Sequence, residues 1–296
     1  MGTKTSDLGR RAFLGGIGFG LVNACTHAGL PSRSESNSAF AEIETHLGGR
    51  LGVAALDTQN GMQLSYRGDE RFAMCSSYKW ILTALVLARA DMGEIALGQP
   101  ISYSTADLID FSPVTKAHAD EGSLSVENLC AAAIEVSDNT AANVLLNVVG
   151  GPQNVTSYLR QLGDKVTRLD RNETSLNTNV PGDERDTTTP NAMVENLKRI
   201  LVGTALSPSA RERLIGWMKN CRTGFKRLRA GLPQDWNEGD KTGTGMNGAA
   251  VDNAIVWPPG RPPILVAAYL SESSGSPTAL DAAHAKIGSI VAIAFR

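Results

Sequence analysis

The order of strand-like and helix-like segments is the feature that most constrains this chain. Short β-like runs stand near both ends, and the long stretch between them has apolar residues at helical spacing. The β-like runs are 51–56, 62–66, 240–245, 249–257 and 264–270. The first two are joined across Asn60-Gly61, a pair that favours the tight turn of a β-hairpin. Strands from both ends are therefore expected to share one antiparallel sheet, with the helical middle inserted as a lobe.

Helical periodicity and helix-ending signals place the remaining elements. The predicted helices are 39–47, 78–90, 126–135, 140–149, 191–201, 209–219 and 278–296. The predicted fold class is α+β: a five-stranded antiparallel sheet flanked by N- and C-terminal helices, with an inserted all-α lobe. Residues 38–68 and 221–296 would form the α/β lobe, and residues 69–220 the all-α lobe. A cleft between two lobes is the natural place for a ligand.

Residues 1–37 precede the fold and are interpreted as an export signal and a tether. Arg10-Arg11 stand ahead of a mildly apolar, glycine-rich run over 12–22, which is too short to span a bilayer. Two adjacent arginines in this place predict export by the twin-arginine route, and an ordinary secretory signal is the alternative. We therefore expect an exported protein, periplasmic or extracellular.

Cys25 stands where the apolar run ends and leaves the mature N-terminus open. Its surroundings resemble a lipoprotein cleavage box, which would make Cys25 a lipid anchor. The alternative is plain cleavage near Ala24 or Ala28, which would release a soluble protein. In either case the Pro/Ser-rich segment 31–38 is expected to be a disordered tether.

Charge and the metal-binding residue types exclude several protein classes. A net charge of -2 gives no electrostatic footprint for nucleic acid. The histidines are isolated in sequence, so no zinc-hydrolase pattern is visible. Apart from Cys25 the cysteines are odd in number and show no metal-site spacing, so at least one thiol is free or bonded to another chain. These residues are His27, His46, His118, His284, Cys75, Cys130 and Cys221.

Three short motifs carry candidate chemistry. Ser76 and Lys79 lie three residues apart at the start of a predicted helix, so they share one helical face. A serine becomes a good nucleophile when a base takes its proton, and a lysine in a dry site can lose its charge and act as that base. Ser137-Asp138-Asn139 lies between two predicted helices, where its side chains can donate and accept protons. On a predicted strand, the lysine and hydroxyl of Lys241-Thr242-Gly243 can hold a carboxylate, and the glycine lets a substrate backbone approach.

Each motif alone is unremarkable, since helix caps and solvated lysines explain it equally well. Together, in this order, they resemble the serine β-lactamase and penicillin-binding protein superfamily, whose three signatures they match. Residues 168–177 also resemble the Ω-loop of class A β-lactamases, whose carboxylate has no equivalent in penicillin-binding proteins. The resemblance covers residues 38–296 and implies hydrolysis of the β-lactam ring through a serine acyl-enzyme, which confers β-lactam resistance.

The resemblance also implies residue roles. Ser76 would be the nucleophile, either Lys79 or Glu173 acting through a water would take its proton, and Ser137 would pass a proton to the leaving nitrogen. Glu173 would then activate the water that hydrolyses the ester. The implied substrate-binding residues are Phe111, Asn139, Asn177, Arg227, Lys241, Thr242, Gly243 and Thr244. The implied partners are small-molecule β-lactams. The resemblance implies no metal or organic cofactor and no stable protein partner, and favours a monomer.

The resemblance also implies roles for two arginines. Many class A enzymes carry an arginine where Ala250 aligns, and Arg227 matches an alternative arginine that serves the same substrate carboxylate in other members. A surface ion pair is the other interpretation of Arg227. Arg171 and Asp186 are expected to form an ion pair that closes the neck of the Ω-loop, because a loop of this length needs a contact that holds its ends together.

Two cysteines lack the partners that relatives give them. The usual partner position of Cys75 is Gly245, and that of Cys130 is Thr83, so both are expected to be reduced, buried thiols.

Three other functions remain as alternatives. A D-Ala-D-Ala peptidase would deacylate slowly, and the glutamate of the Ω-loop argues against it. A penicillin-sensing domain would need a membrane-spanning segment, and a thiol enzyme based on Cys75 would need a histidine in a helpful motif.

Overall fold

The centre of the molecule is a five-stranded sheet in the order β2-β1-β9-β8-β7, antiparallel throughout. Its strands are β1 (Arg50–Asp57), β2 (Gln63–Tyr66), β7 (Asn237–Thr244), β8 (Ala250–Trp257) and β9 (Ile264–Ser271). The computed structural model describes residues 1–3 and 33–296. The predicted twin-arginine pair and Cys25 lie outside the described residues. The predicted sheet and its β1–β2 hairpin are confirmed, and β7 is an edge strand.

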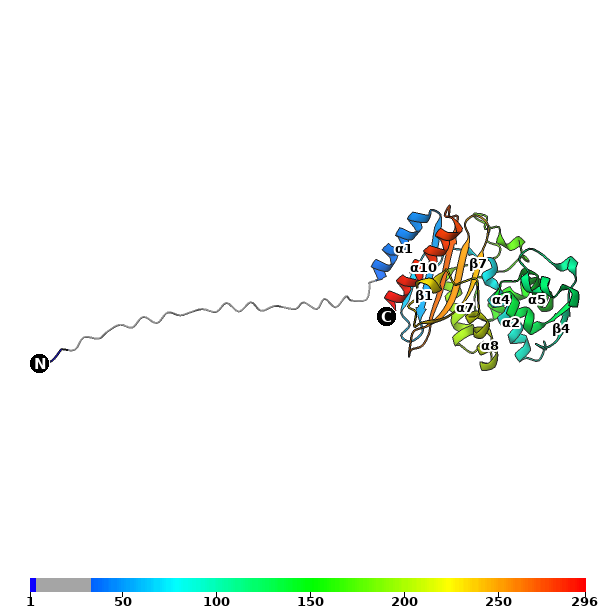
Figure 1. Ribbon diagram of the computed structural model, residues 1–296, viewed down its shortest axis with the longest axis horizontal. Coiled ribbons are helices and arrows are strands. Elements are labelled where there is room, and N and C mark those ends of the chain that lie inside the picture. Colours follow the sequence, from blue (N-terminus) through cyan, green and yellow to red (C-terminus); the bar gives the residue numbers. More distant parts are fainter. Residues whose placement is uncertain (4–32) are drawn as a thin grey trace.

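Helices cover both faces of this sheet (Figure 1). They are α1 (Arg33–Leu47), α2 (Lys79–Asp91), α3 (Pro113–Ala117), α4 (Val126–Glu135), α5 (Asn139–Val149), α6 (Pro152–Gln161), α7 (Pro190–Leu197), α8 (Pro208–Lys219), α9 (Leu228–Gly231) and α10 (Pro277–Ala294). Helices α1 and α10 lie side by side on one face, and the α2, α4, α5 and α8 group lies on the other side.

Helices cover both faces of the sheet, so its side chains are buried on both sides. Successive side chains point in opposite directions, and each strand therefore contributes to two cores. Along β1, Val53 and Ala55 pack into the core under α1 and α10, whereas Ala54 and Leu56 pack into the core that contains α2. A continuous apolar run in the sequence therefore serves two cores.

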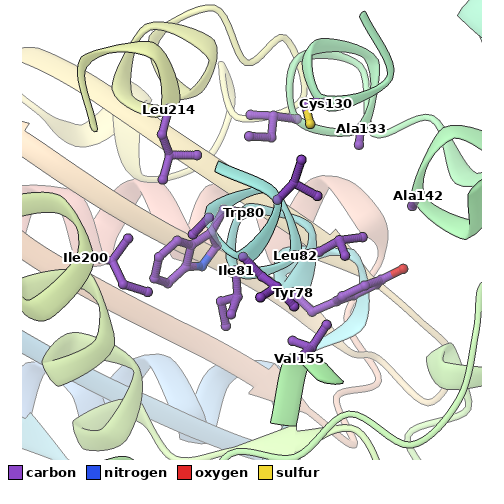
Figure 2. Packing of buried hydrophobic residues seen from close by; sticks show 14 of the residues in the cluster. Tyr78, Trp80, Ile81, Leu82, Cys130, Ala133, Ala142, Val155, Ile200 and Leu214 are labelled. Carbon is purple, nitrogen blue, oxygen red and sulfur yellow. The ribbon is translucent and has the colours of Figure 1, made fainter. Parts of the chain in front are cut away.

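Helix α2 is the axis of the larger core. Figure 2 shows Trp80, Ile81 and Leu82 projecting from it among the surrounding helices. Their neighbours include Cys130, Ala133, Ala142, Val155, Ile200 and Leu214. Each fully buried side chain of this size contributes about 1.5–3 kcal/mol, which helps to offset the cost of burying Lys79 at the start of the same helix.

Capping residues explain several boundaries. Ser125 accepts a hydrogen bond from Asn128 N at the start of α4, and Asp138 accepts one from Ala141 N at the start of α5. Gly150 ends α5 in the left-handed conformation, with φ 84°.

The structure differs from the sequence-based expectation at several elements. Residues 33–38, expected to be part of a disordered tether, belong to α1, where Ser36 and Phe40 are buried. Helix α6 was not predicted, and the last turn of the helix expected over 191–201 is a π-helical segment, Lys198–Val202. Two short strand pairs were also not predicted: β3 (Phe72–Ala73) with β6 (Thr187–Thr188), and β4 (Pro100–Ser102) with β5 (Ser123–Ser125).

Among the helices of the described residues, none has both the length and the apolar character needed to cross a membrane. Cys75, Cys130 and Cys221 are buried and unbonded to one another, as expected for Cys75 and Cys130.

Candidate active site

Ser76 lies in a single 3₁₀ turn, Cys75–Tyr78, that leads directly into α2. Cys75 is left-handed at φ 45°, which turns the chain sharply before the serine. The Ser76 hydroxyl donates to Glu173 Oε1 at 2.7 Å. A hydroxyl and a carboxylate that can accept its proton are therefore in direct contact.

Lys79 is completely buried one turn after Ser76. Its Nζ donates to Ser137 O at 2.8 Å and to Asn139 Oδ1 at 2.6 Å, and it lies 3.1 Å from Glu173 Oε1. Burial lowers the pKa of Lys79, and the Glu173 carboxylate opposes this shift. The ammonium thus connects two of the three motifs and the carboxylate that contacts Ser76.

Ser137 receives hydrogen bonds from two lysines. Lys241 Nζ lies 3.1 Å from its hydroxyl oxygen, and Lys79 Nζ lies 3.3 Å from it. Burial, together with the charge of Lys79, lowers the pKa of Lys241 to about 8. Because both ammonium groups donate, the hydroxyl proton of Ser137 remains free for a third partner.

The other two residues of this motif hold the loop and the lysine in place. Asp138 caps α5 and also accepts hydrogen bonds from Val114 N, Thr115 N and the Thr115 hydroxyl. Asn139 Nδ2 donates to Asp110 O at 2.8 Å, so its oxygen is turned toward Lys79. Asp138 is therefore structural, whereas Asn139 reaches the site.

The segment expected to be an Ω-loop brings Glu173 to the serine. Asn177 Nδ2 donates to Glu173 Oε2 at 2.6 Å. Asn143 of α5 holds the Glu173 backbone on both sides, with distances of 3.0 Å to its N–H and 2.9 Å to its carbonyl. The predicted Arg171–Asp186 pair is confirmed, with Nε and Oδ2 2.5 Å apart.

Arg227 lies behind β7, where the protein itself occupies its donors. It donates to Gly243 O, Val251 O and the Asp281 carboxylate, and also to Thr244 Oγ1 at 2.7 Å. Ala250, the position where many members carry an arginine, pairs with Thr244 across the β7–β8 ladder. Arg227 thus reaches the site through the Thr244 hydroxyl rather than by its own exposed face.

Gly243 stands where a larger residue would not fit. A Cβ there would lie 2.7 Å from Met74 O and 3.0 Å from both Cys75 Cβ and Ser77 N. The glycine therefore lets β7 pack directly against the turn that carries Ser76. Thr242 beside it shares a 2.5 Å hydroxyl–hydroxyl contact with Thr223.

Known proteins resemble this chain in both sequence and structure. A family model described as the β-lactamase enzyme family matches residues 35–295. β-Lactamase AST-1 of Nocardia asteroides is 45% identical over 254 residues, which cover 86% of this chain and 82% of that protein. The solved ancestral Gram-negative class A β-lactamase is 53% identical with a TM-score of 0.86, over 88% of this chain and 100% of that one.

The chain belongs to the class A β-lactamases. Another relative, the carbapenem-hydrolysing β-lactamase KPC of Klebsiella oxytoca, is 46% identical over 231 residues, 78% of each chain. The class A enzyme of Rhodopseudomonas palustris named PenP, described as putative, has a solved structure with a TM-score of 0.85 at 46% identity, over 87% of this chain and 98% of that one.

In this β-lactamase Phe111 is exposed rather than part of a core, and its carbonyl accepts from Asn139 N at 3.1 Å. Phe111 therefore lies next to Asn139 with its side chain exposed. Within the described residues, no group of three or more histidine, cysteine, aspartate or glutamate side chains is placed to hold a metal ion.

Two site residues of the β-lactamase were missed in the sequence. Asn143 follows Asn139 by four positions and so shares its face of α5, a signal that was available. Thr223 gave no local signal, because only the folded chain brings it to Thr242.

Proposed function

We propose that acylation begins when the Ser76 hydroxyl attacks the lactam carbonyl. Its proton goes to Glu173 or Lys79, both of which stand at the serine in one buried hydrogen-bonded group. The backbone N–H groups of Ser76 and Thr244 would bind the developing oxyanion, and such donors contribute roughly 10²–10³ each in rate. The closeness of β7 to the Ser76 turn, enforced at Gly243, supports this placement.

The leaving nitrogen takes its proton from Ser137. Two ammonium groups occupy the lone pairs of this hydroxyl, so its proton is directed elsewhere. Lys79 contacts both Glu173 and Ser137, so the proton taken from Ser76 returns to Ser137 through Lys79 and Glu173 is left as a carboxylate. This sequence leaves Ser76 as an ester and the ring open.

In deacylation, a water takes the hydrogen-bonding position at Glu173 Oε1 that the Ser76 hydroxyl occupied before acylation. Once its oxygen is esterified, Ser76 no longer donates to Glu173 Oε1, and a water can donate there instead. Asn177 holds the other carboxylate oxygen. Glu173 then acts as general base, a role worth about 10²–10⁴ in rate.

The substrate carboxylate binds at Lys241, Thr242 and Thr244. Arg227 donates to Thr244 Oγ1, so the hydroxyl proton of Thr244 is free to bond the carboxylate. Asn139 and Phe111 contact the rest of the substrate at the opposite side. Penicillins and cephalosporins are the proposed substrates.

The Ser76–Glu173 contact carries this proposal. It predicts that Ser76→Ala abolishes benzylpenicillin hydrolysis, followed by the loss of lactam absorbance, whereas the matched exposed-strand variant Ser102→Ala retains it. Hydrolysis at the wild-type rate by Ser76→Ala would refute the role of this serine.

We also propose that the two lobes are residues 38–68 with 221–296, and 69–220, and that the enzyme is an exported monomer. Arg10-Arg11 supports the twin-arginine route. Replacing both arginines by lysine should retain the precursor in the cytoplasm, and undiminished export would favour an ordinary secretory signal. Mass of the mature N-terminus distinguishes lipidated Cys25 from cleavage near Ala24 or Ala28.

A further inference from the structure

Three left-handed residues meet where the Ω-loop touches the β7–β8 turn. Asn179 has φ 45°, Asn247 has φ 50° and Glu272 has φ 58°. Residues other than glycine adopt this conformation infrequently, and asparagine tolerates it better than most. Such conformations persist where surrounding contacts enforce them, and they gather at functional sites.

The two asparagines bind each other's backbone reciprocally. Asn179 Nδ2 donates to Asn247 O at 3.1 Å, and Asn247 Nδ2 donates to Asn179 O at 3.1 Å. Asn247 Nδ2 also lies 3.1 Å from Thr178 O, and the Ser271 hydroxyl donates to Asn179 Oδ1 at 3.0 Å. We call Asn179 and Asn247 the asparagine clasp.

Packing contributes little to this junction. Between residues 170 and 185, all of which are described, Glu173 and Leu176 are the buried side chains. A cavity of about 280 Å³, lined by Asn179, Ser271 and Glu272 among other residues, lies against the clasp. Hydrogen bonds rather than an apolar core therefore fix the loop against the turn.

A short series of hydrogen bonds connects the clasp to Glu173, the proposed general base. Met246 N, next to Asn247, donates to Asn177 O at 2.8 Å. A Cβ on Gly245 would lie only 2.7 Å from the same carbonyl oxygen, so the two backbones are in contact. The Asn177 side chain then donates to Glu173 Oε2. The turn thus sets the position of Asn177, and Asn177 sets one oxygen of Glu173.

We propose that Asn179 and Asn247 are positioning residues for deacylation. This inference rests on the proposed role of Glu173. Acylation uses Glu173 Oε1, which Ser76 and Lys79 hold independently of the clasp. In the acyl-enzyme the hydrogen bond from Ser76 to Glu173 is gone, so the orientation of Glu173 toward the attacking water depends on Asn177, whose position depends on the clasp.

The sharpest variants are Asn179→Asp and Asn247→Asp, which keep shape and left-handed tolerance but replace a donor with an acceptor facing carbonyl oxygens. Asn247→Gly keeps the φ freedom and removes the side chain. The matched control is Asn60→Asp in the β1–β2 turn, where Oδ1 accepts from Met62 N and a carboxylate can still accept.

Acylation and deacylation by benzylpenicillin are measured separately, by stopped-flow and by intact mass of quenched protein. Each clasp variant should deacylate about tenfold more slowly while acylation stays near the wild-type rate, since small misplacements far from the chemistry cost this much or more. The double Asp variant should be no worse than the product of the singles, because both break one junction.

Equal slowing of both steps would overturn the proposal, since a general structural defect would act on both. Deacylation at the wild-type rate in folded clasp variants would also overturn the proposal. If Glu173→Gln still traps an adduct in the same experiment, the role of Glu173 stands and only the clasp is refuted. A different failure, in which wild type itself never releases its adduct, would refute the role of Glu173 and with it the clasp.

Discussion

Gly245, the second residue after Lys241-Thr242-Gly243, allows a sharp test of the described geometry through Gly245→Cys. A Cβ at this glycine would lie 2.7 Å from Cys75 Sγ, close enough for the introduced sulfur to bond Cys75. The bond would close a loop of about 170 residues, for which the chain-entropy model gives roughly 5 kcal/mol.

Part of that gain is lost locally. The same Cβ would lie 2.7 Å from Asn177 O, so the loop must move by a few tenths of an ångström and weaken the Met246–Asn177 hydrogen bond, at a cost of about 1 kcal/mol. A net gain of about 2–4 kcal/mol remains, typical of disulfides. It would raise the unfolding midpoint by roughly 4–8 °C in a domain of this size.

The assay is thermal unfolding with and without reductant, together with a thiol count in denaturant. The oxidised variant should have one free thiol fewer than wild type and lose its extra stability on reduction. Burial raises the pKa of Cys75 to about 12, so oxidation must accompany folding. Gly245→Ser is the matched control, which adds the clash without the bond and should destabilise. One extra thiol and no effect of reductant would refute the described contact.

Three further predictions concern activity. Lys241 has a pKa near 8 and loses its charge above that pH, so kcat/KM for an anionic penicillin should fall at alkaline pH with an apparent pKa near 8. Lys241→Arg should remove this alkaline decrease in kcat/KM, and a decrease that persists in the variant would show that another group causes it. Arg227→Leu leaves Thr244 unoriented and should reduce kcat/KM about tenfold, with a smaller loss for a penicillin ester; equal losses would refute carboxylate orientation. Asn143→Ala removes two hydrogen bonds to the Glu173 backbone, about 2 kcal/mol, and should lengthen the acyl-enzyme lifetime up to roughly 30-fold in a chase experiment; an unchanged lifetime would contradict its role.

Local patterns predicted most of the fold. Asn60-Gly61 predicted the β1–β2 hairpin, and the apolar runs at both chain ends predicted a shared sheet. Helix α6 was missed because Gly150-Gly151-Pro152 is typical of a helix end, whereas Pro152 also opens the next helix at its first position. The start of α1 was placed late because its polar residues obscure the burial of Ser36.

The sequence predicted which side chains come together where those residues belong to short motifs. Ser76, Lys79, Ser137 and Lys241 converge as expected. Contacts between distant segments were not predictable, because no local pattern shows that Thr223 meets Thr242. The asparagine clasp is of the same kind, since its two residues lie 68 positions apart.

The central claim is that Glu173 activates the water that frees Ser76. The most direct measurement is the intact mass of purified protein mixed briefly with benzylpenicillin, for wild type, Glu173→Gln and the matched exposed Ω-loop variant Glu184→Gln. The account predicts unmodified wild type and Glu184→Gln while penicillin disappears, and one stable adduct on Glu173→Gln. A wild-type adduct that lasts for hours would contradict the account and indicate a penicillin-binding peptidase or sensor.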